Sequence, residues 1–154
     1  MHRHDKPGHV ALRNGRISLN GQIYHVTTTS HDRVRVFGDF DTACAVARCF
    51  DNPRLLGDAR MLAWVLMPDH VHWLVELAQG NLDSVVNRLK SSSAREANRW
   101  LHRDGALWAR AYQDHALRRE ENVTAAARYI IANPVRAGLV RHAGDYPFWN
   151  AVWL

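Results

Sequence analysis

The sequence predicts one α+β domain in which helices pack on a central antiparallel β-sheet. Two observations carry this prediction. Short strand-like runs alternate with helix-like runs, and tight turns at Asn20-Gly21 and Pro68-Asp69 join neighbouring strands. The expected order is strand, strand, helix, strand, strand, helix, strand, helix. At 154 residues the chain can bury a core as one domain.

The N-terminal part is expected to hold a tail and the first strands. Residues 1–15 are basic and match no regular pattern, so we expect a flexible tail there and a single domain over 16–154. The strands 17–19 and 22–27 flank Asn20-Gly21, and the second of them alternates β-branched residues. Residues 33–37 are expected to extend this strand or to pair with it.

The middle of the chain is expected to form a helix and a hairpin. Asp39 or Asp41 suits the N-cap of a helix that runs to about Phe50, because apolar residues follow at helical spacing. The hairpin consists of the strands 60–67 and 70–77.

Two helices follow in the C-terminal half. Asn81 or Asp83 caps a long helix to about His102, and Asn122 caps a shorter one that closes before Pro134. A short irregular or strand segment, 107–117, lies between them. Of the six tryptophans, we expect Trp64, Trp73 and Trp100 in the core, and Trp108, Trp149 and Trp153 to be freer to stack on bases.

Bulk properties exclude several classes of protein. No apolar run approaches the length of a membrane span, and the N-terminus has no apolar core like that of a signal peptide. Cys44 and Cys49 are expected to be reduced thiols. We therefore expect a cytoplasmic protein with no membrane partner.

The excess of positive charge is concentrated in residues 83–119. The chain has 20 basic and 15 acidic residues, a net charge of +5, and nearly all the basic residues are arginine, which also follows from a GC-rich genome. Four arginines line one side of the long helix, and such a stripe is either a solvated face or a track for DNA phosphates. The residues expected to contact DNA are Arg88, Lys90, Arg95, Arg99, Arg103, Arg118 and Arg136.

The strand 70–77 opens with two histidines around one apolar residue. Side chains of a strand alternate between faces, so His70 and His72 point to the same side and Val71 to the other. Two imidazoles at this spacing can converge on one divalent metal ion. The spacing alone fits equally well two ordinary polar residues on a half-exposed sheet.

A second group of polar residues lies on the last helix. Tyr129 and Asn133 are four residues apart and share a helix face, while Val123 and Ile130 can pack the helix on the sheet. A phenol and an amide oxygen one turn apart could supply a nucleophile and a metal ligand. An amphipathic tyrosine and a helix-terminal asparagine are the simpler interpretation.

Taken together, the two groups resemble a known family. Met67-Pro68-Asp69-His70-Val71-His72, followed by the segment from Tyr129-Ile130-Ile131-Ala132-Asn133-Pro134 to Val140, is similar to the Y1 tyrosine transposases of the HUH class. The resemblance is closest to the REP-associated branch, related to the IS200/IS605 transposases. Tyr24-His25-Val26-Thr27 and the segment 108–118 also match, so the resemblance covers roughly 22–148.

The resemblance implies a ferredoxin-like HUH endonuclease fold and a role for each motif residue. His70 and His72 would hold a divalent metal, Mg²⁺ or Mn²⁺, and Tyr129 would be the nucleophile. Asn133 falls where the family places a polar third ligand whose identity varies. The implied partner is single-stranded or hairpin DNA with REP-like palindromes, and a homodimer is left open.

The expected activity is that of a transposase that cleaves and rejoins single-stranded DNA through a 5′-phosphotyrosine. Three alternatives are left open. One is a hairpin-binding protein that has lost catalysis, and another is a replication initiator or relaxase-like nickase with the same chemistry. The third is an unrelated histidine-metal hydrolase, which would use water as its nucleophile and form no covalent adduct.

Overall fold

The computed structural model describes residues 21–118 and 121–153. The predicted tail 1–15 and the strand 17–19 lie outside these residues. The described chain forms one five-stranded antiparallel sheet in the order β4-β1-β3-β2-β5. The strands are β1 (Gln22–Thr29), β2 (Ala59–Met67), β3 (His70–Leu77), β4 (Gln113–Ala116) and β5 (Trp149–Ala151).

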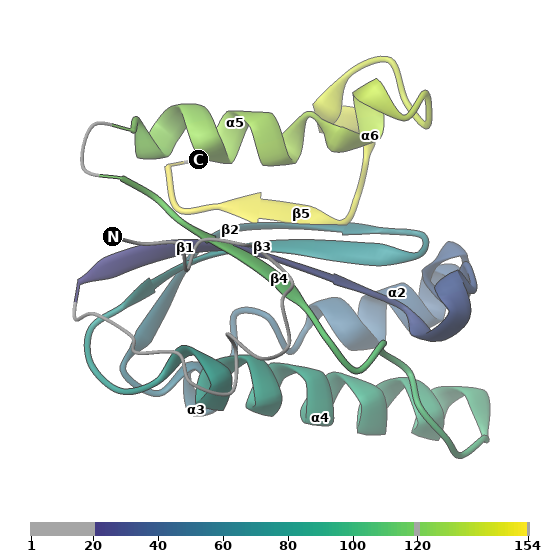
Figure 1. The fold of residues 1–154 in the computed structure, drawn as a ribbon. Coiled ribbons are helices and arrows are strands. Elements are labelled where there is room, and N and C mark those ends of the chain that lie inside the picture. Colours follow the sequence, from purple (N-terminus) through teal and green to yellow (C-terminus); the bar gives the residue numbers. More distant parts are fainter. Residues whose placement is uncertain (1–20, 119–120, 154) are drawn as a thin grey trace.

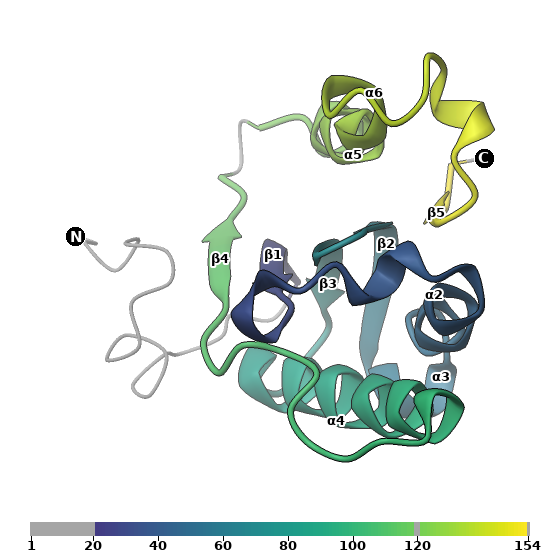
Figure 2. The same cartoon turned by 90° about the vertical axis from the view of Figure 1, so that its right-hand side faces the viewer.

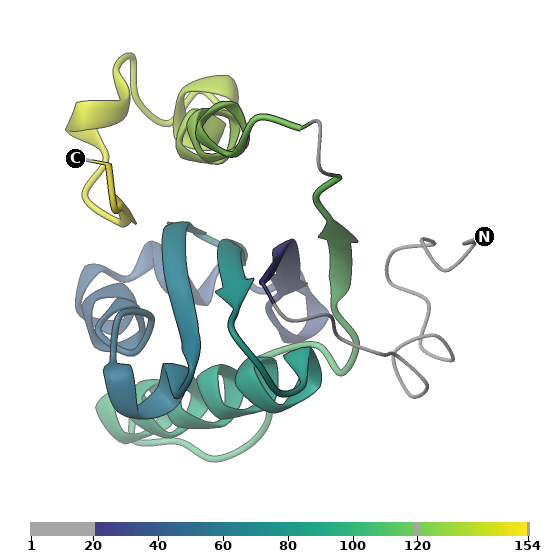
Figure 3. The same ribbon diagram turned by 90° about the vertical axis from the view of Figure 1, so that its left-hand side faces the viewer.

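Helices cover both faces of this sheet, which confirms the predicted fold class. In Figure 1, α3 and α4 lie below the sheet, and α5 and α6 lie above it. The two side views show the short strands β4 and β5 at opposite edges (Figures 2 and 3). The helices are α2 (Phe40–Ala47), α3 (Pro53–Leu56), α4 (Leu82–Leu101), α5 (Val123–Ile131) and α6 (Asn133–Arg136).

The alternation of side chains along β3 creates a separate core on each face of the sheet. Val71, Trp73, Val75 and Leu77 pack in one buried cluster with residues of α2 and α4. Leu74 points to the other face and packs in a second cluster that includes Ile130 of α5. We call this second side, which also carries His70 and His72, the histidine face.

Side-chain caps begin the helices where the sequence predicts them. The Asp39 carboxylate accepts hydrogen bonds from the backbone N–H and the hydroxyl of Thr42, so Asp39 and not Asp41 is the N-cap of α2. Asn81 caps α4 and Asn122 caps α5 through their amide oxygens. No helix in the described residues has the length and apolar character that a membrane span requires.

Three predictions about the fold were wrong. Residues 33–37 form no strand, because 3-10 turns occupy His31–Arg33 and Val36–Gly38. Trp100 is 52% exposed, whereas Trp108 is buried and donates its indole N–H to Ser93. Trp100 follows the apolar stripe of α4, but the last residue of that stripe to be buried is Ala97.

The two neighbouring residues Tyr129 and Ile130 give the packing of α5 a direct test. Ile130 is 1% exposed in the core of the histidine face, and Tyr129 is 62% exposed. We expect Ile130→Ala to lower the free energy of unfolding by about 2–5 kcal/mol, since it leaves a cavity under α5. Tyr129→Phe should change it little. Urea denaturation of both variants measures the difference, and equal losses would contradict this packing.

Candidate metal and nucleophile site

His70 and His72 lie on the central strand of the sheet and point to the same face, as predicted. Their ring centroids are 5.0 Å apart and the rings are nearly perpendicular. On either side of His72 in the sheet lie Thr27 of β1 and Val65 of β2. The strand alternation therefore brings both imidazoles to one place, near the turn that joins β2 to β3.

The inner nitrogen of His70 is held by a carboxylate. Nδ1 of His70 lies 2.8 Å from Oδ1 of Asp69, and Arg33 lies 3.3 Å from the other oxygen of the same carboxylate. Burial alone would raise the pKa of Asp69, but the hydrogen bond with His70 and the charge of Arg33 lower it below its usual value. Asp69 thus stays ionised and accepts a hydrogen bond from Nδ1–H of His70, which leaves the lone pair of that ring on Nε2.

The inner nitrogen of His72 is held by two groups from β1. Nδ1 of His72 lies 2.9 Å from Nε2 of His25 and 3.1 Å from the hydroxyl of Thr27. Within the described residues, neither His70 nor His72 has a hydrogen-bond partner at Nε2. Metal-ligating histidines commonly use one ring nitrogen in this way and bind the metal with the other.

Burial keeps His25 and His72 uncharged at neutral pH. It lowers the pKa of His72 to about 3; the charge of Arg136, and those that His25 and His70 carry when protonated, act in the same direction. Burial also lowers the pKa of His25 to about 4, with a smaller contribution from His115. Neutral imidazole is the form that binds a metal ion.

Tyr129 is exposed to solvent, and the guanidinium of Arg136 stacks on its ring. The guanidinium of Arg136 lies 3.8 Å above the centre of the Tyr129 ring and donates a hydrogen bond of 2.7 Å to the Tyr129 carbonyl. The same charge contributes to the lowered pKa of His72, so it lies within electrostatic reach of that ring. Within the described residues the Tyr129 hydroxyl has no hydrogen-bond partner.

Asn133 lies where α5 gives way to α6. It begins α6, after α5 ends at Ile131, and its amide nitrogen donates to the Ile130 carbonyl at 2.9 Å. Its amide oxygen is the atom that could bind a metal. Among the described residues no three His, Cys, Asp or Glu side chains gather around one point. The donors therefore fit a divalent ion only if an amide, water or phosphate oxygen completes the set.

Comparison with known proteins identifies the family. The family model described as "Transposase IS200 like" matches residues 18–133. The chain belongs to this family.

The relatives agree with this assignment. The REP-associated tyrosine transposase of Escherichia coli K12 is 33% identical over 89 residues, which are 56% of this chain and 50% of that protein. A Haemophilus influenzae relative described in the same terms is 29% identical over 99 residues, 56% of each chain. The chain thus spans about half the length of the curated relatives it matches.

A solved structure shows the same fold. It is that of a REP-associated tyrosine transposase bound to a REP hairpin, which superimposes with a TM-score of 0.66 at 22% identity. The match covers 87% of this chain and 79% of the other.

The sheet separates the predicted DNA-binding arginines into two groups. Arg136 lies on the histidine face, whereas the stripe on α4 packs on the opposite side, where several of its members already have partners. Arg88 donates to the Leu55 carbonyl, Lys90 to the Ala109 carbonyl, Arg99 pairs with Glu96, and Arg103 donates to Asn98. Arg95 and Arg118 are exposed.

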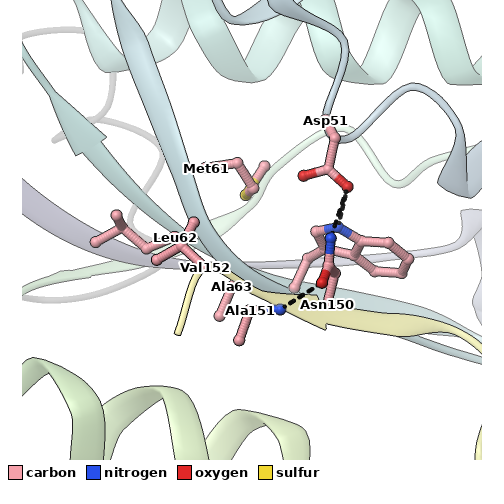
Figure 4. A pocket seen from close by; sticks show the side chains of 8 residues that line it. Asp51, Met61, Leu62, Ala63, Asn150, Ala151 and Val152 are labelled. Carbon is pink, nitrogen blue, oxygen red and sulfur yellow. Dashed lines mark hydrogen bonds between the residues drawn. The ribbon is translucent and has the colours of Figure 1, made fainter. Parts of the chain in front are cut away.

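Two surface hollows lie away from the site. One, of about 10 Å³, has room for about one water molecule and is bordered by β2 and β5. Figure 4 shows Asp51 and Asn150 in its lining. Asp51 accepts hydrogen bonds from Trp64 and Asn150. The other, of about 500 Å³, lies between α3 and the start of α4, on the side of the sheet that faces away from the histidines.

Sequence reasoning missed the two residues that hold His72 and the arginine that pairs with the Asp69 carboxylate behind His70. His25, Thr27 and Arg33 were not predicted as site residues, although Tyr24-His25-Val26-Thr27 matched the family. Strand alternation places His25 and Thr27 on one face, and that signal was present in the sequence. The register that sets them beside His72 is a long-range feature of the sheet.

The lowered pKa values of His25 and His72 predict a stability that depends on pH. In the unfolded chain both have the ordinary value of 6.5, so between about pH 6.5 and 4 the unfolded state binds protons that the folded state does not. Above pH 6.5 these two histidines do not lower the free energy of unfolding. As the pH falls below 6.5, the free energy of unfolding decreases by at most about 1.4 kcal/mol per pH unit for each histidine.

Urea denaturation in EDTA at several pH values measures this effect. His72→Gln should flatten the fall in the free energy of unfolding, whereas His142→Gln, at an exposed position, serves as the matched control. Identical pH profiles for the wild-type protein and His72→Gln would show that His72 is not held neutral by the fold.

Proposed function

We propose that this protein cleaves and rejoins single-stranded DNA beside a hairpin, with Tyr129 as nucleophile. His70 and His72 would hold a divalent ion, Mg²⁺ or Mn²⁺, with Asn133 as a further ligand. The observation that carries the proposal is the pair of histidines on one face, each with Nδ1 engaged and Nε2 without a partner in the described residues. Two imidazoles prepared in this way, on the face of the sheet that the helix of the exposed Tyr129 covers, suit this chemistry.

The proposed reaction exchanges one phosphodiester for another. The Tyr129 oxygen attacks the phosphorus, its proton passes to solvent, and the bond from phosphorus to the 3′ oxygen breaks. The 5′ end stays on Tyr129 as a phosphotyrosine, and the other end leaves as a 3′-hydroxyl after it takes up a proton. A bound divalent ion would supply polarisation of the phosphoryl oxygens. A second 3′-hydroxyl can reverse the step without ATP, since the bond energy is retained.

Arg136 is suited to meet the phosphate between these groups. Its guanidinium lies on the Tyr129 ring, its charge reaches His72, and it has no carboxylate partner among the described residues. A planar guanidinium without a carboxylate is a ready donor to phosphate oxygens. We therefore assign to Arg136 a contact with the scissile phosphate.

The substrate is proposed by analogy with the relatives. A relative of the same fold is bound to a REP hairpin, and the curated relatives are REP-associated. A single strand can reach an exposed tyrosine without melting a duplex, and a hairpin marks where cleavage occurs. We propose an imperfect palindrome as the partner of this chain.

The strand is proposed to cross α5 and α6 rather than α4. From Asn122 to Gly144 the sequence has no Asp or Glu, and Arg128, Arg136 and Arg141 are all exposed. The α4 stripe, by contrast, lies across the sheet from Tyr129, and part of it is committed to contacts within the protein. The track along α4 stays a prediction and becomes the alternative outcome of a test.

Tyr129→Phe removes one exposed oxygen and should abolish strand cleavage while hairpin affinity stays within about twofold of the wild type, since the lost group acts in the reaction and not in binding. The measurement is incubation with labelled single-stranded hairpin DNA and Mn²⁺, followed by a denaturing gel for the covalent adduct. Tyr24→Phe, at a buried position of β1, is the matched control.

Each outcome of this experiment separates one interpretation from the others. An adduct in the wild type that is lost in Tyr129→Phe supports the proposal. Cleavage without an adduct would indicate water as the nucleophile, and hairpin binding without cleavage would indicate a protein that has lost catalysis. His70→Ala should also lose cleavage, through loss of the metal.

Matched double charge reversals compare the two candidate surfaces. We expect Arg128→Glu with Arg141→Glu to weaken hairpin binding at least tenfold and to reduce the salt slope by roughly 0.7 for each phosphate of the single strand that the protein no longer neutralises. Arg95→Glu with Arg99→Glu makes the same change in net charge on α4 and should have the smaller effect. If the Arg95→Glu/Arg99→Glu variant bound the hairpin more weakly than the Arg128→Glu/Arg141→Glu variant, the DNA would cross α4 instead.

A further inference from the structure

His25 is a third imidazole beside the proposed metal site, and no part of the proposed reaction uses it. It lies on β1, half-buried, with its ring 5.0 Å from that of His72 and inclined by 42°. Its Nε2 atom lies 2.9 Å from Nδ1 of His72. One of these two nitrogens must donate a proton and the other must accept it.

The direction of that hydrogen bond decides whether His72 can bind a metal. If Nε2 of His25 carries a hydrogen, it donates the hydrogen bond and Nδ1 of His72 accepts that bond. Neutral His72 then carries its own hydrogen on Nε2, where it prevents metal binding. If Nδ1 of His72 carries the proton, His25 accepts it and Nε2 of His72 keeps its lone pair. Two tautomeric arrangements of the pair therefore correspond to a closed and an open ligand.

We propose that His25 is a positioning residue that accepts a hydrogen bond from Nδ1–H of His72. It thereby selects the tautomer of His72 whose unprotonated Nε2 can bind a divalent cation. This inference rests on the proposed function in one respect, the assignment of His72 as a metal ligand. It adds a residue from a different strand to the site and gives that residue a defined task.

The two proposed ligands differ in what holds them. His70 is held by the Asp69 carboxylate, which can only accept a proton, so its tautomer is fixed by charge. His72 is held by an imidazole and by the Thr27 hydroxyl, and both of these can donate or accept. The hydroxyl is the more distant at 3.1 Å and can rotate, so His25 has the larger part in the choice.

Removal of the acceptor should weaken metal binding without loss of the fold. We expect His25→Phe, which keeps a ring and removes both nitrogens, to weaken Mn²⁺ binding about 10–100-fold. His25→Gln keeps an acceptor near Nδ1 and should recover most of the affinity. Thr27→Val, a change of similar size on the second partner, is the matched control and should have a smaller effect.

The test measures Mn²⁺ affinity by the electron paramagnetic resonance of free Mn²⁺, without DNA and in the Tyr129→Phe background. Thermal unfolding of the metal-free proteins checks that each variant folds. Nitrogen-15 shifts of the metal-free wild-type protein supply a readout that needs no substitution at His25. We expect a protonated Nδ1 and a bare Nε2 on His72.

The outcomes separate this inference from the proposed function. His25→Phe with unchanged Mn²⁺ affinity, or a metal-free wild type with the His72 proton on Nε2, would overturn the role of His25 and leave the transposase chemistry in place. A wild-type protein that binds Mn²⁺ through this tautomer but forms no phosphotyrosine would overturn the proposed function and leave the role of His25 in place.

Discussion

The register in which β1 pairs with β3 is the constraint on which the site depends. It sets Thr27 opposite His72 and His25 opposite Leu74, so both side chains from β1 meet the inner nitrogen of His72. A slip of one residue would turn them to the other face of the sheet. Tyr24 and Val26 resist that slip, because both are buried in the core between the sheet and α4 and would turn to the histidine face.

The sheet divides the molecule into a side that stabilises it and a side that can act. On the side of α2 and α4, Phe50 contacts Trp64 and Trp73 edge-on, with its ring centroid 5.2 and 5.4 Å from theirs, and these large side chains bury much apolar surface. Above the sheet, α5 covers the strands with small and aliphatic residues such as Ala127 and Ile130. The histidine end of that face keeps polar groups that a continuous apolar core would exclude.

Local rules in the sequence predicted much of this arrangement. The strand His70–Leu77 and the caps Asn81 and Asn122 follow from alternation and side-chain chemistry within a few residues. The helix before Pro134 ends as expected, but the proline also lies in the first turn of α6, where its missing N–H is harmless. The roles predicted for Tyr129 and Asn133 do not follow from such local rules and came from the resemblance to the family.

Features that depend on distant contacts were beyond the sequence. β5 has three residues and exists because β2 offers it an edge. Trp108 is buried because its segment bridges to Ser30 and its indole meets Ser93, neither of which is near in sequence. The prediction that Trp100 is buried was wrong, because helical periodicity does not show where the layer that a helix packs on ends.

The proposed donors around the metal site carry no net charge, and this suits a phosphodiester substrate. His70 and His72 would ligate as neutral imidazoles and Asn133 as an amide, while Asp69 stays behind His70 and contacts only its inner nitrogen. A carboxylate ligand would cancel part of the charge of a divalent ion, whereas neutral ligands leave that charge to act on the phosphate.

Neutral donors would also let the proposed substrate complete the site. Mg²⁺ prefers oxygen ligands and commonly uses substrate phosphates to complete its shell, so two imidazoles and one amide leave room for the strand to contribute. Binding of metal and DNA would then favour each other equally, as linkage requires. The surface beside Tyr129 continues the same arrangement, because the charged residues of the sequence from Asn122 to Gly144 are arginines alone. A strand that approached the tyrosine, as proposed, would therefore meet no carboxylate from this segment.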